Sequence, residues 1–203
     1  MRNATIALVL LAASLGAQAQ ESHWRFMAGL GYADGGEKIA SGTITTIGTN
    51  HVQPFDIQSG NGFQFRVGAE YRLSDRIALQ GSLGHSSSEA MGINGSYDFT
   101  VIPLELRGFV DIASGWRIGL GARQSSAELR GTGVSANSPV NGTFVSSQGA
   151  VLEVQYLFQS EGAGRSKSMP QFGLSLRGVN EKFTQTLGTL NGNHVEIGAV
   201  IYY

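Results

Sequence analysis

The sequence predicts an all-β fold, an eight-stranded antiparallel transmembrane β-barrel with up-and-down topology. Three observations support it: apolar and polar side chains alternate in eight segments, the connections alternate between long and short, and the composition is unusual. Charged residues make up 14% of the chain, and 29 of its 203 residues are glycine. An average soluble domain has about 25% charged residues and about 7% glycine.

The composition excludes several functional classes. The formal net charge is -1, so no basic excess is available to neutralise nucleic-acid phosphates. The chain has no cysteine, which excludes disulfide scaffolds and cysteine-ligated metals. Its four histidines are scattered, without the spacing of a metal site. We therefore expect no nucleic-acid partner, no metal and no cofactor.

The first nineteen residues resemble an export signal. Arg2 gives a positive start, residues 6–13 are apolar, and Ala17 and Ala19 are small residues at the positions that a signal peptidase requires. The apolar stretch is too short to span a bilayer as a helix. We predict a signal peptide at 1–19, cleaved after Ala19, and one barrel domain at 20–203.

The remaining chain has no apolar stretch approaching the ~18 residues of a membrane helix, but closed barrels also satisfy every backbone group in lipid. The clearest alternation covers residues 63–73, close to the ~9–11 residues of a tilted membrane strand. The predicted strands are residues 24–32, 63–73, 76–83, 97–110, 116–123, 151–158, 172–177 and 194–203.

One predicted strand, 97–110, changes the parity of its apolar residues. Tyr97, Phe99 and Val101 share one parity, whereas Ile102 and Leu104 share the other. Proline inside a strand often accompanies a bulge. The sequence therefore predicts a bulge near Pro103 that brings both halves onto one face.

The connections between the predicted strands alternate in length. Long, polar ones cover 33–61, 86–96, 124–147 and 182–193, whereas 74–75 and 111–115 are short and 159–170 is intermediate. Outer-membrane barrels have long extracellular loops and short periplasmic turns. An even number of strands also places both termini on the periplasmic side.

Alternation alone does not say which face is outside, because a soluble lipocalin-like barrel has the reverse arrangement. Three features favour an apolar exterior: arginine and glutamate dominate the polar face, aromatic residues gather near strand ends, and glycine recurs on the polar face. The predicted lumen ion-pair network is Arg66, Glu70, Arg72, Arg117, Arg123, Glu153, Arg177 and Glu196, with Glu105 and Arg107 expected to join it.

An eight-stranded barrel is only just wide enough for its own side chains. Buried ions are stable only when paired, so we expect arginine–glutamate pairs and a plugged or very narrow lumen. Aromatic rings near the strand ends are expected to form girdles at the two bilayer interfaces. The predicted girdle comprises Trp24, Tyr32, Phe63, Tyr71, Trp116, Tyr156, Phe158, Phe172 and Tyr202.

The C-terminus carries a further pattern, with a polar residue at Glu196, glycine at Gly198, an apolar residue at Ile201 and an aromatic residue at Tyr203. Together with the signal peptide and the alternation, this resembles the small outer-membrane β-barrel proteins of Gram-negative bacteria, the OmpA-type transmembrane domain and the opacity-protein, porin-like family. The resemblance covers essentially all of 20–203. It implies an outer-membrane monomer in contact with membrane lipid and lipopolysaccharide, whose C-terminal signal is read by the barrel-assembly machinery.

The expected function is a structural or narrow-pore role in the cell envelope. One alternative is a surface adhesin or ligand binder, because loops such as 33–61 carry recognition on a rigid scaffold. A second is a lipid A-modifying enzyme, since some eight-stranded barrels catalyse such reactions with a histidine and a serine. His85 and Ser86, followed by Glu89, would be the candidates, but residues 84–88 do not match the deacylase signature. We therefore expect no catalytic residues.

Overall fold

The computed structural model describes residues 23–45, 52–93, 95–158, 170–185 and 188–203. The predicted signal peptide at 1–19 lies outside these residues. No helix in the described ranges is long and apolar enough to cross a membrane.

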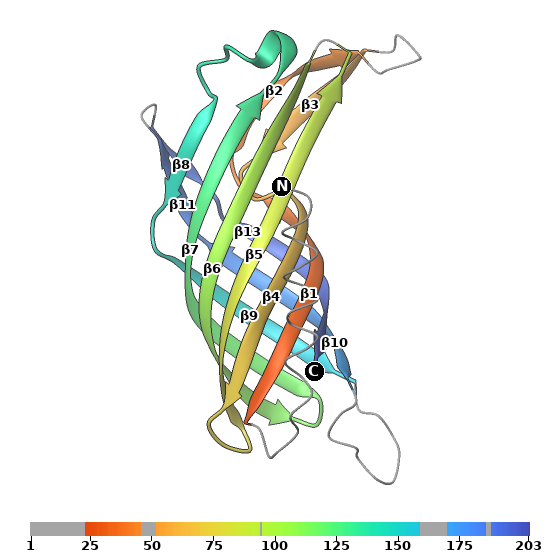
Figure 1. Ribbon diagram of the computed structural model, residues 1–203, viewed down its shortest axis with the longest axis vertical. Coiled ribbons are helices and arrows are strands. Elements are labelled where there is room, and N and C mark those ends of the chain that lie inside the picture. The colour runs from red at the N-terminus through yellow and green to blue at the C-terminus, as the bar shows by residue number, and fades with distance from the viewer. Residues whose placement is uncertain (1–22, 46–51, 94, 159–169, 186–187) are drawn as a thin grey trace.

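Eight strands form a closed antiparallel ring (Figure 1). Each ring strand pairs with its neighbours, and β1 pairs with both β4 and β13, which closes the barrel. The predicted fold class is therefore confirmed. The ring strands are β1 (Trp24–Gly35), β4 (Gly62–Arg72), β5 (Ile77–Gly92), β6 (Gly95–Ala113), β7 (Trp116–Gly131), β9 (Gly149–Leu157), β10 (Gln171–Asn180) and β13 (His194–Tyr202).

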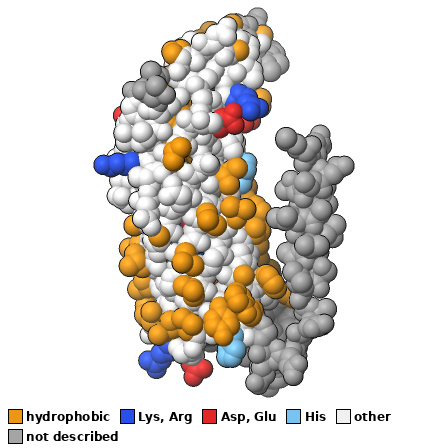
Figure 2. All heavy atoms as spheres, turned by 60° about the vertical axis from the view of Figure 1, so that its left-hand side comes forward, with side chains coloured by type: hydrophobic (Ala, Val, Ile, Leu, Met, Phe, Trp, Pro, Cys, Tyr) orange, Lys and Arg blue, Asp and Glu red, His pale blue; other side chains and the backbone are white. Residues whose placement is uncertain are grey.

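The wall of the barrel is apolar outside and polar inside. On β10, Leu174 and Leu176 point outward and are more than half exposed, whereas Ser175 and Arg177 between them are buried. Figure 2 shows apolar side chains spread over the lower part of the wall, with charged side chains above and below them. A soluble lipocalin-like barrel has the opposite arrangement, so that alternative is excluded.

The predicted bulge near Pro103 is wrong. The β5–β6 register is the same on both sides of Pro103, since Leu83 pairs with Leu104 and Ser86 with Val101. The irregularity lies instead between Asp111 and Ala113. Strand β6 keeps one parity throughout, so Phe99 and Val101 point into the barrel beside Pro103.

The long connections contain strands of their own, so the ladder continues beyond the predicted loop boundaries. In Figure 1, β5, β6 and β7 rise above the rest of the wall, toward β2 and β3; we call this the long-loop end and the opposite side the short-turn end. The additional elements are β2 (Lys38–Thr45), β3 (Val52–Gln58), β8 (Gly142–Ser146), β11 (Lys182–Gln185), β12 (Gly188–Asn191) and the 3-10 turn η2 (Gly133–Ser135).

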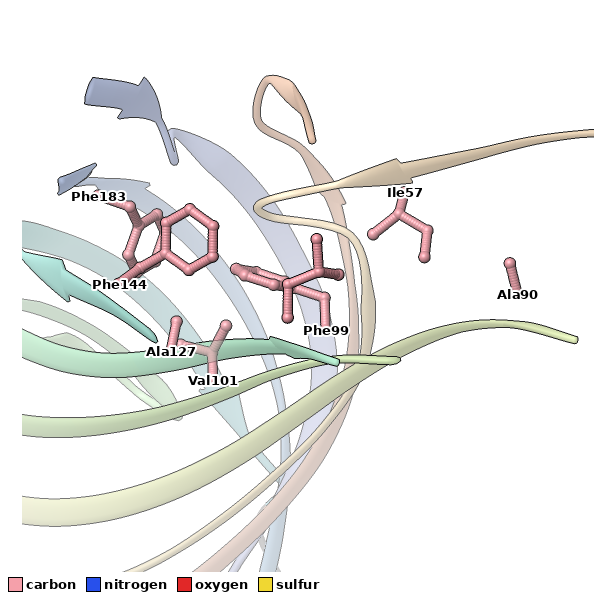
Figure 3. Close-up of a cluster of buried hydrophobic side chains, with 8 residues drawn as sticks. Ile57, Ala90, Phe99, Val101, Ala127, Phe144 and Phe183 are labelled. Atoms are coloured by element: carbon pink, nitrogen blue, oxygen red, sulfur yellow. The ribbon is translucent and has the colours of Figure 1, made fainter. Parts of the chain in front are cut away.

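An apolar cluster fills the interior at the long-loop end. Phe99 packs edge-on against Phe144 and Phe183, with ring centroids 5.8 Å and 6.1 Å away (Figure 3). We call the cluster the apolar cap; its buried members are Ile57, Ala90, Phe99, Val101, Ala127, Leu129, Phe144 and Phe183.

The residues beside the apolar cap show where the lipid-facing belt ends. Asp98 and Thr100, which flank Phe99 on β6, are polar, as are Ser126 and Glu128, which flank Ala127 on β7. The cap therefore lies beyond the part of the wall that is apolar outside. This position explains why the interior changes from polar to apolar without a bulge.

Candidate functional site

The lumen at the level of the apolar belt is filled by charged side chains. Among the residues that the structure describes, ten arginines and glutamates are at most 3% exposed, and the two signs are present in equal number. Burial without a partner would strongly destabilise each ion, so the balance is a requirement of the fold. These residues are Arg66, Arg107, Arg117, Arg123 and Arg177 with Glu70, Glu105, Glu153, Glu181 and Glu196.

Glu70 organises the short-turn end of the lumen. Its carboxylate pairs with Arg25 and with Arg117, the latter at 2.5 Å. The Arg117 guanidinium also stacks over the Phe109 ring at 4.0 Å from its centroid. The Tyr202 hydroxyl, buried in the same layer, donates to Gln155 Oε1 at 2.9 Å. This layer therefore combines paired charges with a hydrogen-bonded tyrosine hydroxyl.

Arg177 is the centre of the middle layer. Its guanidinium pairs with Glu196, lies 2.6 Å from Glu105 Oε1 and 3.4 Å from Glu153 Oε2. Arg107 also pairs with Glu153 and donates to Ser82 Oγ at 2.8 Å. Charge-assisted hydrogen bonds of this kind fix both the orientation and the charge of each group.

Arg123 connects the middle layer to the long-loop end. Its guanidinium lies 3.0 Å from Glu105, 3.1 Å from Glu181 and 3.4 Å from Glu196. Nε2 of the buried His194 lies 3.0 Å from the same Glu196 carboxylate. Arg123 on β7 therefore joins β6, β13 and the segment just after β10 through side-chain contacts.

Glycine provides the room for these large side chains. A Cβ built on Gly29 would lie 3.4 Å from Arg66 Nη2, and one on Gly119 would overlap the Phe109 ring. Arg66 lies 3.8 Å from Glu153 and 4.0 Å from Glu196, so its ion pairs are looser than those of Arg107 and Arg177. The narrow interior thus alternates between large and absent side chains.

The structure brings most of the predicted network residues together, but Arg72 differs. It ends β4 at the short-turn rim, where it is about one-third exposed and pairs with Asp111 at 2.9 Å. The prediction used parity alone and so ignored how close Arg72 is to the strand end. Glu181 was missed because it lies between the predicted strand, which ended at residue 177, and the predicted loop 182–193, although it continues the inward parity of Arg177 and Val179.

The predicted aromatic girdle requires one correction. Tyr202 is 1% exposed and points into the lumen, because it shares the parity of Glu196 and Val200. The other eight residues point outward, and two close pairs, Trp24–Tyr71 and Trp116–Tyr156, have ring centroids 4.9 Å and 5.0 Å apart at the short-turn end. Tyr32 and Phe63 are cross-strand neighbours near the long-loop end.

The placement of the tryptophans can be measured without a variant. The chain has two tryptophans, Trp24 and Trp116, and both lie at the short-turn end of the belt. We expect lipids brominated near the headgroup to quench the fluorescence more than lipids brominated near the chain terminus, because interfacial rings sit at headgroup level. Stronger quenching by the deep bromines would contradict this placement.

The last strand closes the ring against β1. The Tyr203 amide donates to the Phe26 carbonyl at 2.8 Å, and the Phe26 amide donates to the Tyr203 carbonyl at 2.7 Å. The Tyr203 side chain is half exposed on the outer surface. Of the other residues in the C-terminal pattern, Glu196 lies in the lumen, Gly198 lies against β1 and Ile201 faces outward.

His85 and Ser86 lie on opposite faces of β5. His85 is exposed on the outer surface beside Phe65, whereas Ser86 is buried inside the barrel. Glu89 shares the outer face with His85 and Ser87, and the Ser87 hydroxyl donates to Asp98 at 3.1 Å. Adjacent residues in a strand cannot form a histidine–serine pair, because their side chains point in opposite directions.

This geometry defines a transmembrane β-barrel with a lipid-facing wall and a lumen filled by ion pairs. The sequence matches the family described as outer membrane protein beta-barrel domain over residues 5–198, and the chain belongs to that family. The resemblance to small Gram-negative outer-membrane barrels is therefore confirmed, and with it a place in the outer membrane. No curated protein sequence matches the chain.

Solved structures with similar folds include several small outer-membrane barrels. Neisserial surface protein A is 14% identical, with a TM-score of 0.48 over 89% of this chain and 96% of that one. Ail of Yersinia pestis, solved with the heparin analogue sucrose octasulfate, is 12% identical, with a TM-score of 0.49 over 89% and 99%. OprG of Pseudomonas aeruginosa is 9% identical, with a TM-score of 0.42 over 89% and 95%.

Proposed function

We propose that the chain is a closed, non-conducting barrel with a structural role in the outer membrane. The observation that carries this proposal is the burial of the lumen side chains. Arg107, Glu153 and Arg177 are at most 1% exposed, so water has almost no access to the middle of the lumen from either end of the barrel. A conducting pore needs lumen groups that contact water, and wide aqueous pores need about sixteen strands.

Two further features support a closed barrel. The lumen charges are joined in ion pairs, and Arg177 alone contacts three carboxylates. Moving its side chain aside would therefore break several ion pairs. The apolar cap lies above these charges at the long-loop end. An ion entering from that side would therefore meet an apolar layer before the ion pairs.

Planar-bilayer recording tests this proposal. The purified, refolded barrel is expected to show no stepwise conductance, while a sixteen-stranded porin inserted under the same conditions provides the positive control. Insertion of the barrel is checked separately, by its protection from protease in vesicles of the same lipid. Reproducible unitary steps from inserted protein would favour the narrow-pore role instead.

We infer a second role, as a scaffold for recognition at the cell surface. The long-loop end has its own strands and its own apolar cap, so its surface is held rigid rather than left as a flexible loop. With the short-turn end in the periplasm, this surface faces outward from the cell. Rigidity lowers the entropy lost on binding and so favours a recognition surface.

The remaining expectations concern partners. We infer that the barrel contacts outer-membrane lipid and lipopolysaccharide through its apolar wall, and that the assembly machinery reads the C-terminal strand through Tyr203, whose ring is available on the surface. A lipid A-modifying activity receives no support from His85 and Ser86, because they face opposite sides of β5.

A further inference from the structure

A hollow lies in the outer wall of the barrel, on the side formed by β7, β9, β10, β13 and β1. The strand register places its main lining residues in one row across the wall, because each is the cross-strand partner of the next. In order across the five strands, the row consists of Leu120, Leu152, Gly178, Val195 and Asp34.

Gly178 makes a gap in the middle of this row. Its neighbours Leu152 and Val195 both point outward and are more than half exposed. A Cβ built on Gly178 would meet no atom within 4 Å, so the space outside it is open. The result is a notch one side chain wide, with an apolar wall on each side. Its shape and polarity suit a single acyl chain.

The hollow has a polar rim toward the long-loop end. On β1 the outward-facing residues are apolar up to Tyr32, and the next outward-facing residue is Asp34. On β10 the next outward-facing residue after Gly178 is Asn180. The outward-facing residue before Val195 of β13 is Asn193, just before the strand begins. All three rim residues line the hollow. The hollow therefore spans the boundary between the hydrocarbon and the headgroups.

The rim favours a particular headgroup chemistry. Asp34 offers carboxylate oxygens and Asn180 an amide oxygen, so the rim can accept several hydrogen bonds. Asn193 Oδ1 already accepts from the Glu181 amide at 3.0 Å, so this residue contributes its side-chain N–H groups. The residues that line the hollow include no lysine or arginine. A headgroup that donates hydrogen bonds from hydroxyl and amide N–H groups fits this rim, whereas a site that depends on phosphate would need basic side chains.

We propose that the hollow binds lipid A, the acylated amino-sugar part of lipopolysaccharide. One acyl chain occupies the notch at Gly178, sugar hydroxyl and amide groups donate to Asp34 and Asn180, and the Asn193 side-chain N–H groups donate to sugar oxygens. The apolar part of the hollow is continuous with the lipid-facing belt, and the polar rim faces the leaflet at the long-loop end. The proposal rests on the proposed contact with lipopolysaccharide and on the proposed orientation of the barrel, and it holds whether or not the lumen conducts.

Native mass spectrometry of the full barrel, released from detergent after incubation with one defined lipid, tests the site. The lipids are diphosphoryl lipid A, monophosphoryl lipid A, phosphatidylethanolamine and phosphatidylglycerol. Both forms of lipid A are expected to be retained equally, because no lysine or arginine lines the hollow and the buried His194 ring is already bonded to Glu196 and the Gly192 carbonyl. Phosphatidylglycerol is expected to be retained more weakly, because it offers two hydroxyl donors and no amide. Phosphatidylethanolamine can pair its ammonium with Asp34, but it is also expected to be retained more weakly, because it has no further donor for Asn180.

Two substitutions locate the site. Gly178→Leu fills the notch and should lower lipid A retention about tenfold, the effect of losing burial of about two methylene groups. Gly81→Leu is the matched control, because Gly81 is also an outward glycine with no atom within 4 Å of a built Cβ, but it lies on β5, away from the hollow. Gly81→Leu should bind as the unaltered chain does.

Asp34→Ala should weaken lipid A retention, because it removes an acceptor used by the sugar. Each variant is first shown to fold by its heat-dependent migration on a denaturing gel. Equal retention by Gly178→Leu and Gly81→Leu would overturn the site. Phospholipids retained as well as lipid A, or a strong preference for the diphosphoryl form, would overturn the proposed headgroup recognition.

Discussion

Glu153→Ala is expected to lower the free energy of unfolding of the barrel by about 3–5 kcal/mol, the usual effect of removing one partner from a buried ion pair. Glu153 is fully buried and pairs with Arg107, and it also lies 3.4 Å from Arg177 and 3.8 Å from Arg66. Its removal leaves the lumen with one more buried arginine than glutamate. Urea titration in lipid vesicles, followed by the fraction that migrates as folded protein in an unheated gel, measures the change.

Glu128→Ala provides the matched control for this experiment. Glu128 also pairs with an arginine, Arg130, at 2.9 Å, but both side chains are about half exposed or more. Exposed ion pairs contribute at most about 1 kcal/mol, so the urea midpoint should hardly move. If Glu153→Ala were as mild as Glu128→Ala, the lumen charges would be solvated, and the closed-barrel proposal would lose its main support.

Most of the fold can be predicted from the alternation of apolar and polar residues along each strand. Lipid forces every outward residue of a spanning strand to be apolar, and backbone hydrogen bonding forces the sheet to close. These two constraints predict both the strands and the face that points inward. They do not apply beyond the lipid belt, where β8, β11 and β12 follow from the packing of Phe144 and Phe183 against Phe99.

The false bulge near Pro103 has the same origin. The prediction required a polar interior at every height of the barrel, so inward Phe99 and Val101 looked like a change of face. The structure places them in the apolar cap, where the interior is apolar and the exterior polar. Strand parity therefore predicts the inward face reliably only where it is known whether that part of the strand lies in lipid or in water.

Parity predicts which face of the barrel wall a residue occupies, but not its position along the barrel axis or its ion-pair partner. Arg72 and Tyr202 show both limits, because Arg72 lies at the rim and Tyr202 has inward parity despite its aromatic ring. Which glutamate meets which arginine depends on the stagger of the strands. Arg177 reaches Glu105 across the lumen, for example, although their strands are not neighbours in the ring.

Phe99→Ala is expected to have the second large effect, confined to the long-loop end. Phe99 is 1% exposed and packs against two further rings, and removing such a side chain destabilises its surroundings by about 3–5 kcal/mol. Lys38, Arg130 and Lys182 lie in or beside the strands of this region, so trypsin can report its opening. We expect cleavage after these residues to become at least about tenfold faster, in proportion to the population of the open state.

Val145→Ala is the control, because Val145 lies next to Phe144 on β8 but points outward and is 66% exposed. It should leave the cleavage rate nearly unchanged. The barrel of the Phe99 variant should still migrate as folded protein and stay silent in bilayers, because the ion pairs below the apolar cap involve other side chains. Loss of the folded band would mean that cap and barrel unfold together. The surface would then be an integral part of the barrel, and the proposed separation between a structural barrel and a recognition surface would fail.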